Sequence, residues 1–225
     1  MSRYHGPIVY MIVIGLVAGL VYVAEKTKDL KLEKPVTPPP GAVLIAQKNM
    51  GGFSMAQVLI EQEVGTLAKR GVDWNQHHQM VRAQVQKLPV SDMMIFRAKA
   101  LDKTSALEER YVSVYLLSLA GMEAHHALFD IVRTPIVASK VANTKSRVIY
   151  DQHESAIRAR AMVALDQLAL VNPAQVQASM KKLAQLKSSP QIKNYARISL
   201  AGIKQGQPGK LSKYMNQTTA SAEAM

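Results

Sequence analysis

The stretch ESAIRARAMVALDQLALVNPAQVQASMKKLAQLKSSPQIKNYARISLAGIK, residues 154–204, predicts a succession of α-helices. Its apolar residues recur at spacings of three and four, which is the period of one helix face. Asn172-Pro173 and Ser189-Pro190 interrupt the pattern, and each places a proline where a new helix can begin. We therefore predict helices over roughly 154–171, 174–187 and 190–204.

The same stretch contains a weak internal repeat. Ile157, Ala161, Leu165 and Leu168 recur 35 residues later as Ile192, Ala196, Leu200 and Ile203. The pattern Ile-Arg-x-x-Ala-x-x-Ala-Leu at 157–165 resembles a HEAT-type repeat, and the resemblance implies helix pairs stacked as a short solenoid. An irregular helical bundle accounts for the same spacing, so both architectures stay open. The resemblance implies no particular function.

The preceding residues extend the helical pattern, so we predict an all-α domain over 53–205. Ser54 with Gln57, and Asp73 with Gln76, have the spacing of a capping box. Further helices are expected over roughly 54–70, 74–88 and 91–103, and a long one is expected from Ser105 onward, with Gly121 bending or dividing it. Residues 206–225 are rich in small and polar side chains, and we expect a flexible tail there.

The N-terminal region has the pattern of a membrane anchor. After a short tail, residues 1–7, the segment Ile8–Ala24 holds 17 residues without a charge, the lower limit for a membrane-spanning helix. A retained signal anchor is favoured because cleavage after Ala24 would put the large Tyr22 where a small residue is needed. Gly15 and Gly19 form a GxxxG pair, which predicts close packing against another membrane helix.

Residues 25–52 form a charged and proline-rich linker, which predicts a stiff spacer that holds the helical domain away from the bilayer. The lysines that follow the span favour a cytoplasmic domain by the positive-inside rule. The short N-terminal tail with its single Arg3 has, by contrast, the layout of an export signal. We expect the helical domain on the periplasmic or extracytoplasmic side.

Charge is unevenly distributed along the chain. The net charge is +12, and residues 167–222 contain no Asp or Glu. Because unpaired ammonium groups resist burial, the cations of the last two helices should face solvent as a basic surface. Its predicted members are Lys181, Lys182, Lys187, Lys193, Arg197 and Lys204. Such a surface attracts an acidic protein face or anionic lipid. Nucleic acid is disfavoured because only Tyr195 and Tyr214 are available there for stacking.

No catalytic or metal-binding motif emerges. The chain has no cysteine, and the phosphate-binding, nucleophile-elbow and zinc-protease patterns are absent from its sequence. His77-His78 and His125-His126 are adjacent pairs, but Glu123 and His126 supply the Glu-x-x-His spacing only once, whereas a di-metal bundle needs it twice. We therefore expect no metal, no cofactor and no enzyme activity, with one histidine of each pair packed and the other exposed.

These features predict a membrane-anchored helical scaffold or adaptor subunit of a multi-protein membrane complex. A bacterial envelope assembly, such as a secretion or conjugation apparatus, is a suitable setting. Two alternatives stay open. One is a metal- or haem-binding protein or enzyme that uses the histidine pairs. The other is a membrane-tethered binder of an anionic polymer, nucleic acid or glycan, through the basic C-terminal helices.

Overall fold

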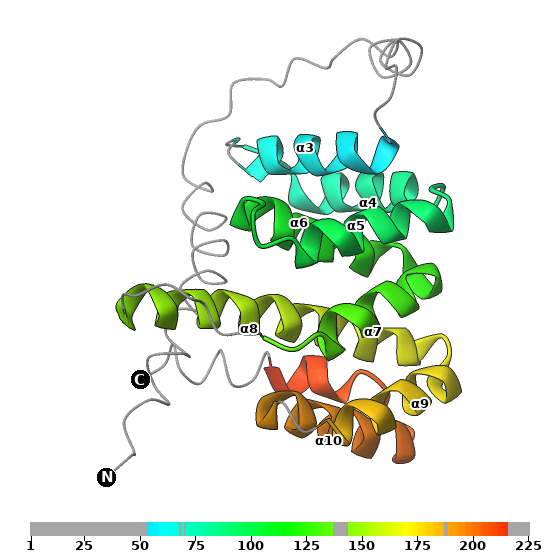
Figure 1. Cartoon of the computed structure of the whole chain (residues 1–225). Coiled ribbons are helices and arrows are strands. Elements are labelled where there is room, and N and C mark those ends of the chain that lie inside the picture. The colour runs from blue at the N-terminus through cyan, green and yellow to red at the C-terminus, as the bar shows by residue number, and fades with distance from the viewer. Residues whose placement is uncertain (1–53, 68, 70, 137–143, 187–188, 216–225) are drawn as a thin grey trace.

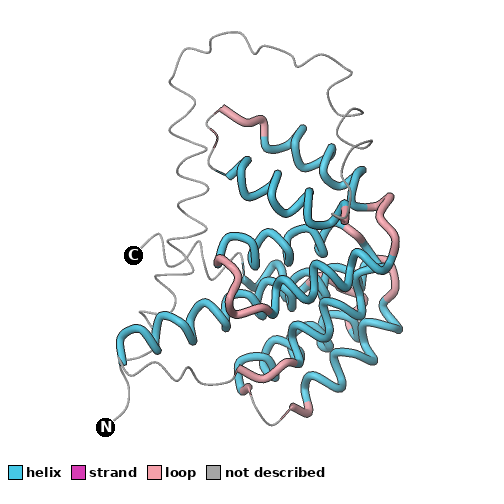
Figure 2. The backbone as a smooth tube through the Cα atoms, turned by 45° about the horizontal axis from the view of Figure 1, so that its top comes forward, coloured by secondary structure: helices cyan, strands magenta, loops and turns pink. Residues whose placement is uncertain are grey.

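The computed structural model of the chain describes residues 54–67, 69, 71–136, 144–186 and 189–215. In these ranges every regular element is a helix, and no strand occurs (Figure 2). The all-α prediction is confirmed for this part of the chain. The elements are α3 (Met55–Leu67), α4 (Trp74–Val85), α5 (Val90–Leu101), α6 (Leu107–Leu119), the 3-10 helix η2 (Gly121–Ala124), α7 (His125–Arg133), α8 (Thr144–Gln167), the 3-10 helix η3 (Leu168–Leu170), α9 (Pro173–Ala184) and α10 (Pro190–Lys204).

The helices stack in two rows (Figure 1). In one row α3 packs on α5, α5 on α7, and α7 on α9; in the other, α4 packs on α6, α6 on α8, and α8 on α10. The rows join where α3 and α5 meet α6, where α7 meets α8 and where α9 meets α10. The extensive contacts in the described residues therefore run between neighbours in the stack, and α3 and α10 lie at its opposite ends.

Capping side chains start several helices where the sequence predicts them. Ser54 Oγ accepts from the Gln57 backbone N–H at 3.3 Å, and the Gln57 side chain accepts from the Ser54 N–H at 3.4 Å. Asp73 caps α4 by accepting from the N–H groups of Asn75 and Gln76. Ser105 is different, because its hydroxyl donates to Asp102 and the N-cap residue of α6 is Ala106. Each side-chain cap satisfies a helix N–H that would otherwise lack a partner.

Gly121 divides the predicted long helix. Its φ of +68° lies in the left-handed region, which only glycine adopts at little cost. α6 ends at Leu119, a short 3-10 turn follows, and α7 begins at His125. The break lets α7 leave the direction of α6 and join the other row, where it contacts α5.

A single apolar core runs through the stack. Each of the five helices from α5 to α9 contributes fully buried side chains, among them Phe96, Leu116, Ile131, Met162 and Met180 in that order. Burial of each such side chain is worth about 1.5–3 kcal/mol.

Two methionines, one of α4 and one of α5, lie outside this core. Met80 and Met94 are 53% and 45% exposed. Only Val81 and Val85 of α4 are buried, so this helix covers the end of the stack with most of its surface in solvent.

The C-terminal boundary of the fold lies beyond its predicted position. Residues 210–215 are helical, and Leu211 is fully buried in the core. The expectation of a flexible tail from residue 206 therefore does not describe this segment. Residues 216–225 lie outside the described residues, as do the predicted tail 1–7, the span 8–24 and the whole linker 25–52 with its neighbour Phe53. None of the described helices is long and apolar enough to cross a membrane.

Candidate functional site

The predicted basic surface lies on α9 and α10, the last helix pair of the stack. Both helices start at the predicted Asn-Pro and Ser-Pro steps. The Asn172 side chain accepts from the Gln175 N–H at 3.2 Å, and Ser189 Oγ accepts from the Ile192 N–H at 3.3 Å. A proline in the first turn of each helix needs no N–H partner, which makes these starts favourable.

The apolar faces of this pair turn inward. Val176, Met180 and Leu183 of α9 are buried, as are Ile192, Tyr195 and Ala196 of α10. Ile198 and Leu200 are half-buried against the same core. Because these side chains fix the rotation of both helices, the charged residues between them must point away from the stack.

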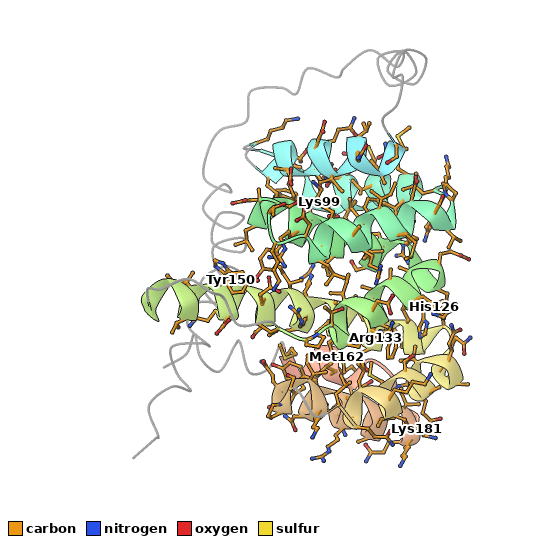
Figure 3. All side chains as sticks on the ribbon, viewed as in Figure 1. Lys99, His126, Arg133, Tyr150, Met162 and Lys181 are labelled. Carbon is orange, nitrogen blue, oxygen red and sulfur yellow. The ribbon has the colours of Figure 1, made fainter. Side chains whose placement is uncertain are left out.

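Four of the six predicted cations are exposed. Lys181, Lys182, Arg197 and Lys204 face solvent, and Lys193 is half-buried. Lys187 lies outside the described residues. Figure 3 places Lys181 at the end of the stack that is farthest from α3. Within the described part of the chain, no ion pair neutralises any of these five side chains.

Helix electrostatics explains only part of this surface. Lys181, Lys182 and Lys204 occupy the last turns of their helices, where a cation complements the helix dipole. Lys193 and Arg197 lie away from the last turn of α10, so the dipole gives them no comparable role. The surface therefore carries an excess of positive charge, which a negatively charged binding partner would complement.

A shallow depression of about 360 Å³ adjoins the basic surface, between α10 and the helical segment 210–215. It is lined by Ile198, Ala201, Gln207, Lys210, Lys213 and Tyr214. On α10, Arg197 lies one turn before Ala201, and Lys204 lies three residues after it. Both cations therefore lie on the same face of α10 as this lining residue. The wall of the depression combines apolar side chains with lysines.

Buried contacts hold the second wall of this depression in place. Asp166 of α8 is fully buried, and its carboxylate accepts from the backbone N–H of Leu211 at 3.1 Å and of Ser212 at 3.4 Å. The Ser199 hydroxyl of α10 donates to the other oxygen. Burial raises the pKa of Asp166, and these three hydrogen bonds oppose that shift. The carboxylate therefore acts as an N-terminal cap that joins α8, α10 and residues 210–215.

Gly202 allows the same segment to approach α10 closely. A Cβ atom at this position would lie 2.5 Å from Lys210 Cβ and 2.7 Å from the Gln207 carbonyl oxygen. Only a residue without a side chain fits this contact. The depression is therefore built by specific packing of residues 207–215 on α10.

Local sequence does not predict Lys210, Lys213 or Tyr214 as site residues. Gly206, Pro208 and Gly209 precede them and indicate a tail. The spacing of Leu211 and Met215, four residues apart, is a local sign of a short amphipathic helix. The hydrogen bond from Leu211 N–H to the Asp166 carboxylate spans 45 residues, and no local sequence pattern predicts it.

One histidine pair divides between core and solvent as expected. His125 is 3% exposed and His126 is exposed. The Gln175 side-chain N–H donates to Nδ1 of His125 at 3.2 Å, so Nε2 carries the proton and faces Ser179 Oγ at 3.1 Å. Burial, with a smaller effect of the neighbouring His126, lowers the pKa of His125. The ring docks α9 on α7 in its neutral form.

In the other pair His77 is the packed ring, and His78 is exposed. His77 is half-buried and lies 2.8 Å from Oε2 of Glu63, which is 6% exposed. His78 Nδ1 lies 3.1 Å from the hydroxyl of Tyr115. These contacts join α4 to α3 and α6 and account for both rings structurally.

The histidines do not form a metal site in the described residues. Glu123 and His126 are both exposed on the surface. No group of three or more His, Asp or Glu side chains is arranged to hold a metal ion in this part of the chain. The structure therefore brings together no ligand set that would favour the metal-binding alternative.

A buried charge cluster in the middle of the stack was also missed from sequence. Glu154 of α8 is 1% exposed and pairs with Arg110 of α6 at 2.5 Å and with Arg158 at 2.7 Å. Arg158 also donates to the carbonyl of Thr134 at 2.8 Å, and Arg110 donates to that of Ala100 at 3.0 Å. The Glu154–Arg158 spacing of four residues was a local signal, but the Arg110 contact is not local.

The cluster is suited to joining helices. Although burial opposes the charged form of Glu154, hydrogen bonds and charges from Arg158 and Arg110 lower its pKa overall. The cluster links α6, α8 and the end of α7, and the side chains of its three members are 5% exposed or less. We assign it a structural role.

The chain matches no protein-family model, no curated protein and no solved structure. Gly15 and Gly19, the predicted packing site of the span, lie outside the described residues. The basic surface with its adjoining depression is therefore the candidate site that the described geometry supports best.

Proposed function

We propose that this chain is a membrane-anchored, non-catalytic helical scaffold that docks an acidic partner protein through its C-terminal helix pair. The observation that carries the proposal is the position of the unpaired cations. They lie on the last pair of the stack, while α3, the first described helix after the predicted anchor and linker, lies at the opposite end (Figure 1). A domain of this layout would hold a partner away from the bilayer.

The architecture supports this role. Two rows of helices in which neighbours pack on neighbours favour the short solenoid over the irregular bundle. Solenoids present extended outer surfaces and commonly serve as binding platforms. The anchor at 8–24, its Gly15–Gly19 packing face, the extracytoplasmic placement and the setting in an envelope complex remain part of the proposal and rest on the sequence.

An acidic protein is favoured over nucleic acid as the partner. Of the two aromatic residues that could stack on bases, Tyr195 is 8% exposed and its hydroxyl accepts from the Gln191 side chain at 2.9 Å. Base stacking needs an accessible ring face, so this tyrosine does not provide one. The remaining features of the surface are positive charge, apolar contact and the single exposed ring of Tyr214, which together suit an acidic protein face.

Charge reversal in the full-length chain tests the proposal. The variant carries Lys181→Glu, Lys182→Glu and Arg197→Glu and is purified gently from membranes beside the unchanged chain. We expect it to lose a partner that the unchanged chain retains at low salt and releases at high salt, because exposed charges are screened over about 8 Å at physiological ionic strength.

A matched variant controls for total charge. Lys69→Glu, Arg82→Glu and Lys87→Glu make the same change at exposed positions near the other end of the stack. This control should retain the partner, and both variants should keep the helical circular dichroism signal. Equal retention of every partner by both variants at every salt concentration would refute the proposed docking surface.

A further inference from the structure

The depression between α10 and residues 210–215 has features that a purely electrostatic surface does not need. Ile198 and Ala201 supply apolar contact on one wall, and Tyr214 supplies an aromatic ring on the other. Its volume of about 360 Å³ falls in the range of about 300–1,000 Å³ that is usual for sites that accept small ligands or side chains. A partner that offered only negative charge would make no contact with this apolar lining.

Cations surround the apolar lining. Lys210 and Lys213 form part of the wall, and Arg197 and Lys204 lie on the same face of α10 as the lining residue Ala201. The Lys210 ammonium donates to the Gln205 side chain at 2.8 Å, which holds it near the end of α10. No described carboxylate forms an ion pair with any of these four residues. Asp166, the acid nearest to the segment, is buried and directed at backbone N–H groups.

The site is also formed in advance of binding. The Asp166 cap and the close approach at Gly202 fix residues 207–215 against α10. A wall held in this way does not have to be ordered by the ligand, which reduces the entropy lost on association.

We propose that this depression is a recognition site for an acidic peptide segment that inserts a bulky apolar side chain. The apolar side chain lies against Ile198, Ala201 and Tyr214, and flanking carboxylates pair with the surrounding lysines and arginine. The inference rests on the proposed scaffold function and gives the chemistry of its partner: an acidic segment with an apolar anchor residue. Acidic flanks provide long-range attraction, and the anchor residue provides specificity.

The test uses the full chain in detergent and a fluorescent synthetic peptide in which a Leu-Phe pair is flanked on both sides by Glu and Asp. One control peptide replaces Leu-Phe by Ser-Ser and keeps the charge. The other keeps Leu-Phe and replaces the acids by Gln. We expect the first peptide to bind at least about tenfold more tightly than the Ser-Ser control, because burial of a large apolar side chain is worth that much. It should also bind more tightly than the Gln control, which lacks the carboxylates that pair with the lysines.

Filling the depression separates its role from that of charge. Ala201→Phe places a ring in the site and should weaken the Leu-Phe peptide about tenfold, while leaving the weak binding of the Ser-Ser peptide unchanged. The matched control is Ala83→Phe at an exposed position of α4. If Ala201→Phe alters the fold, Lys213→Glu at the exposed edge serves instead and should weaken both acidic peptides.

The outcomes distinguish this inference from the proposed function. Equal binding of the Leu-Phe and Ser-Ser peptides would overturn the recognition site and leave the electrostatic docking surface intact. Tighter binding of single-stranded DNA or of vesicles containing anionic phosphatidylserine, with no effect of Ala201→Phe, would also overturn it. The triple charge reversal, tested separately, changes only charge, so it tests electrostatic docking and does not test the apolar anchor.

Discussion

The carboxylate of Asp166 accepts a hydrogen bond from the backbone N–H of Leu211, which lies 45 residues later in the chain, at 3.1 Å. One buried side chain of α8 thereby starts the last helical segment of the described fold. Asp166→Ala removes the acceptor from the N–H groups of Leu211 and Ser212, and it leaves the Ser199 hydroxyl without its partner. We expect a loss of about 2–3 kcal/mol in the free energy of unfolding, measured by denaturant titration.

Hydrogen exchange should locate this effect. In Asp166→Ala the amides of Leu211 and Ser212 should exchange much faster, while those of α4 stay protected. Asp73→Ala is the control, because it removes an exposed cap from α4 and should cost only about 1 kcal/mol. Unchanged exchange at Leu211 in Asp166→Ala would contradict the capping role.

Substitutions at two glycines should have effects of opposite sign. Gly202→Ala forces the new Cβ against the Gln207 carbonyl and Lys210 Cβ, so residues 207–210 must move away and the free energy of unfolding should fall. Gly65→Ala meets no atom within 4 Å and should stabilise α3 by about 0.5–1 kcal/mol. Thermal unfolding of both variants checks the prediction, which fails if Gly202→Ala is as stable as Gly65→Ala.

Protonation of Glu154 should destabilise the middle of the stack. The pKa of this carboxyl is lower in the folded chain than its ordinary value of 4.5, because Arg158 and Arg110 stabilise the charged form against the effect of burial. The folded state therefore holds its proton less tightly than the unfolded state. Its stabilising contribution is complete above pH 4.5 and is lost as the pH falls through the lower, folded-state pKa.

Glu154→Gln should remove this pH dependence and lower stability at neutral pH. Loss of one partner from a buried charge cluster costs about 3–5 kcal/mol, because the guanidinium groups of Arg110 and Arg158 are then buried without a carboxylate partner. Urea titrations of both chains between pH 3 and pH 7 measure the difference. Parallel stability curves of the unchanged chain and the variant over this range would show that Glu154 does not titrate as described.

Protonation of His125 should weaken the docking of α9 on α7. Burial and the neighbouring His126 lower the pKa of His125 below 6.5, so the folded state binds this proton less readily than the unfolded state. Its stabilising contribution is therefore present above pH 6.5 and is lost as the pH falls through the folded-state pKa. Amides of α9 should lose protection from hydrogen exchange over that interval.

His125→Gln should abolish this acid-induced loosening, because an amide does not titrate there. The exposed His78 provides the comparison, and His78→Gln should leave the pH response of α9 as it is in the unchanged chain. An identical response in His125→Gln would assign the loosening to another group.

The predicted helix boundaries agree with the structure where a capping residue and a proline fix the start of a helix. The helix Pro190–Lys204 coincides with its predicted range, because Ser189 caps it and Pro190 starts it. α8 begins at Thr144, ten residues before its predicted start at 154. Its first part extends past the neighbouring helices in Figure 1. This part needs no apolar face for packing, so its sequence shows no clear apolar periodicity.

The candidate site was only partly predictable. Exposure of Lys181, Lys182, Arg197 and Lys204 follows from the high energy of burying an unpaired charge. The depression beside them depends on Asp166 and Gly202, whose partners are set by tertiary packing. The Arg110–Glu154 pair likewise joins helices distant in sequence, and such pairs cannot be recognised from the spacing of residues.

The stacking of neighbour on neighbour also determines how the domain would carry mechanical load. Tension applied between the first residue of α3 and a partner held on α10 would pass through each helix pair in series, since the extensive contacts join only adjacent elements. The weakest junction would then set the force at which the domain yields. The Arg110–Glu154–Arg158 cluster braces the junction of α6 with α8. A pulled molecule should therefore keep its middle folded after the junctions nearer its two ends have yielded.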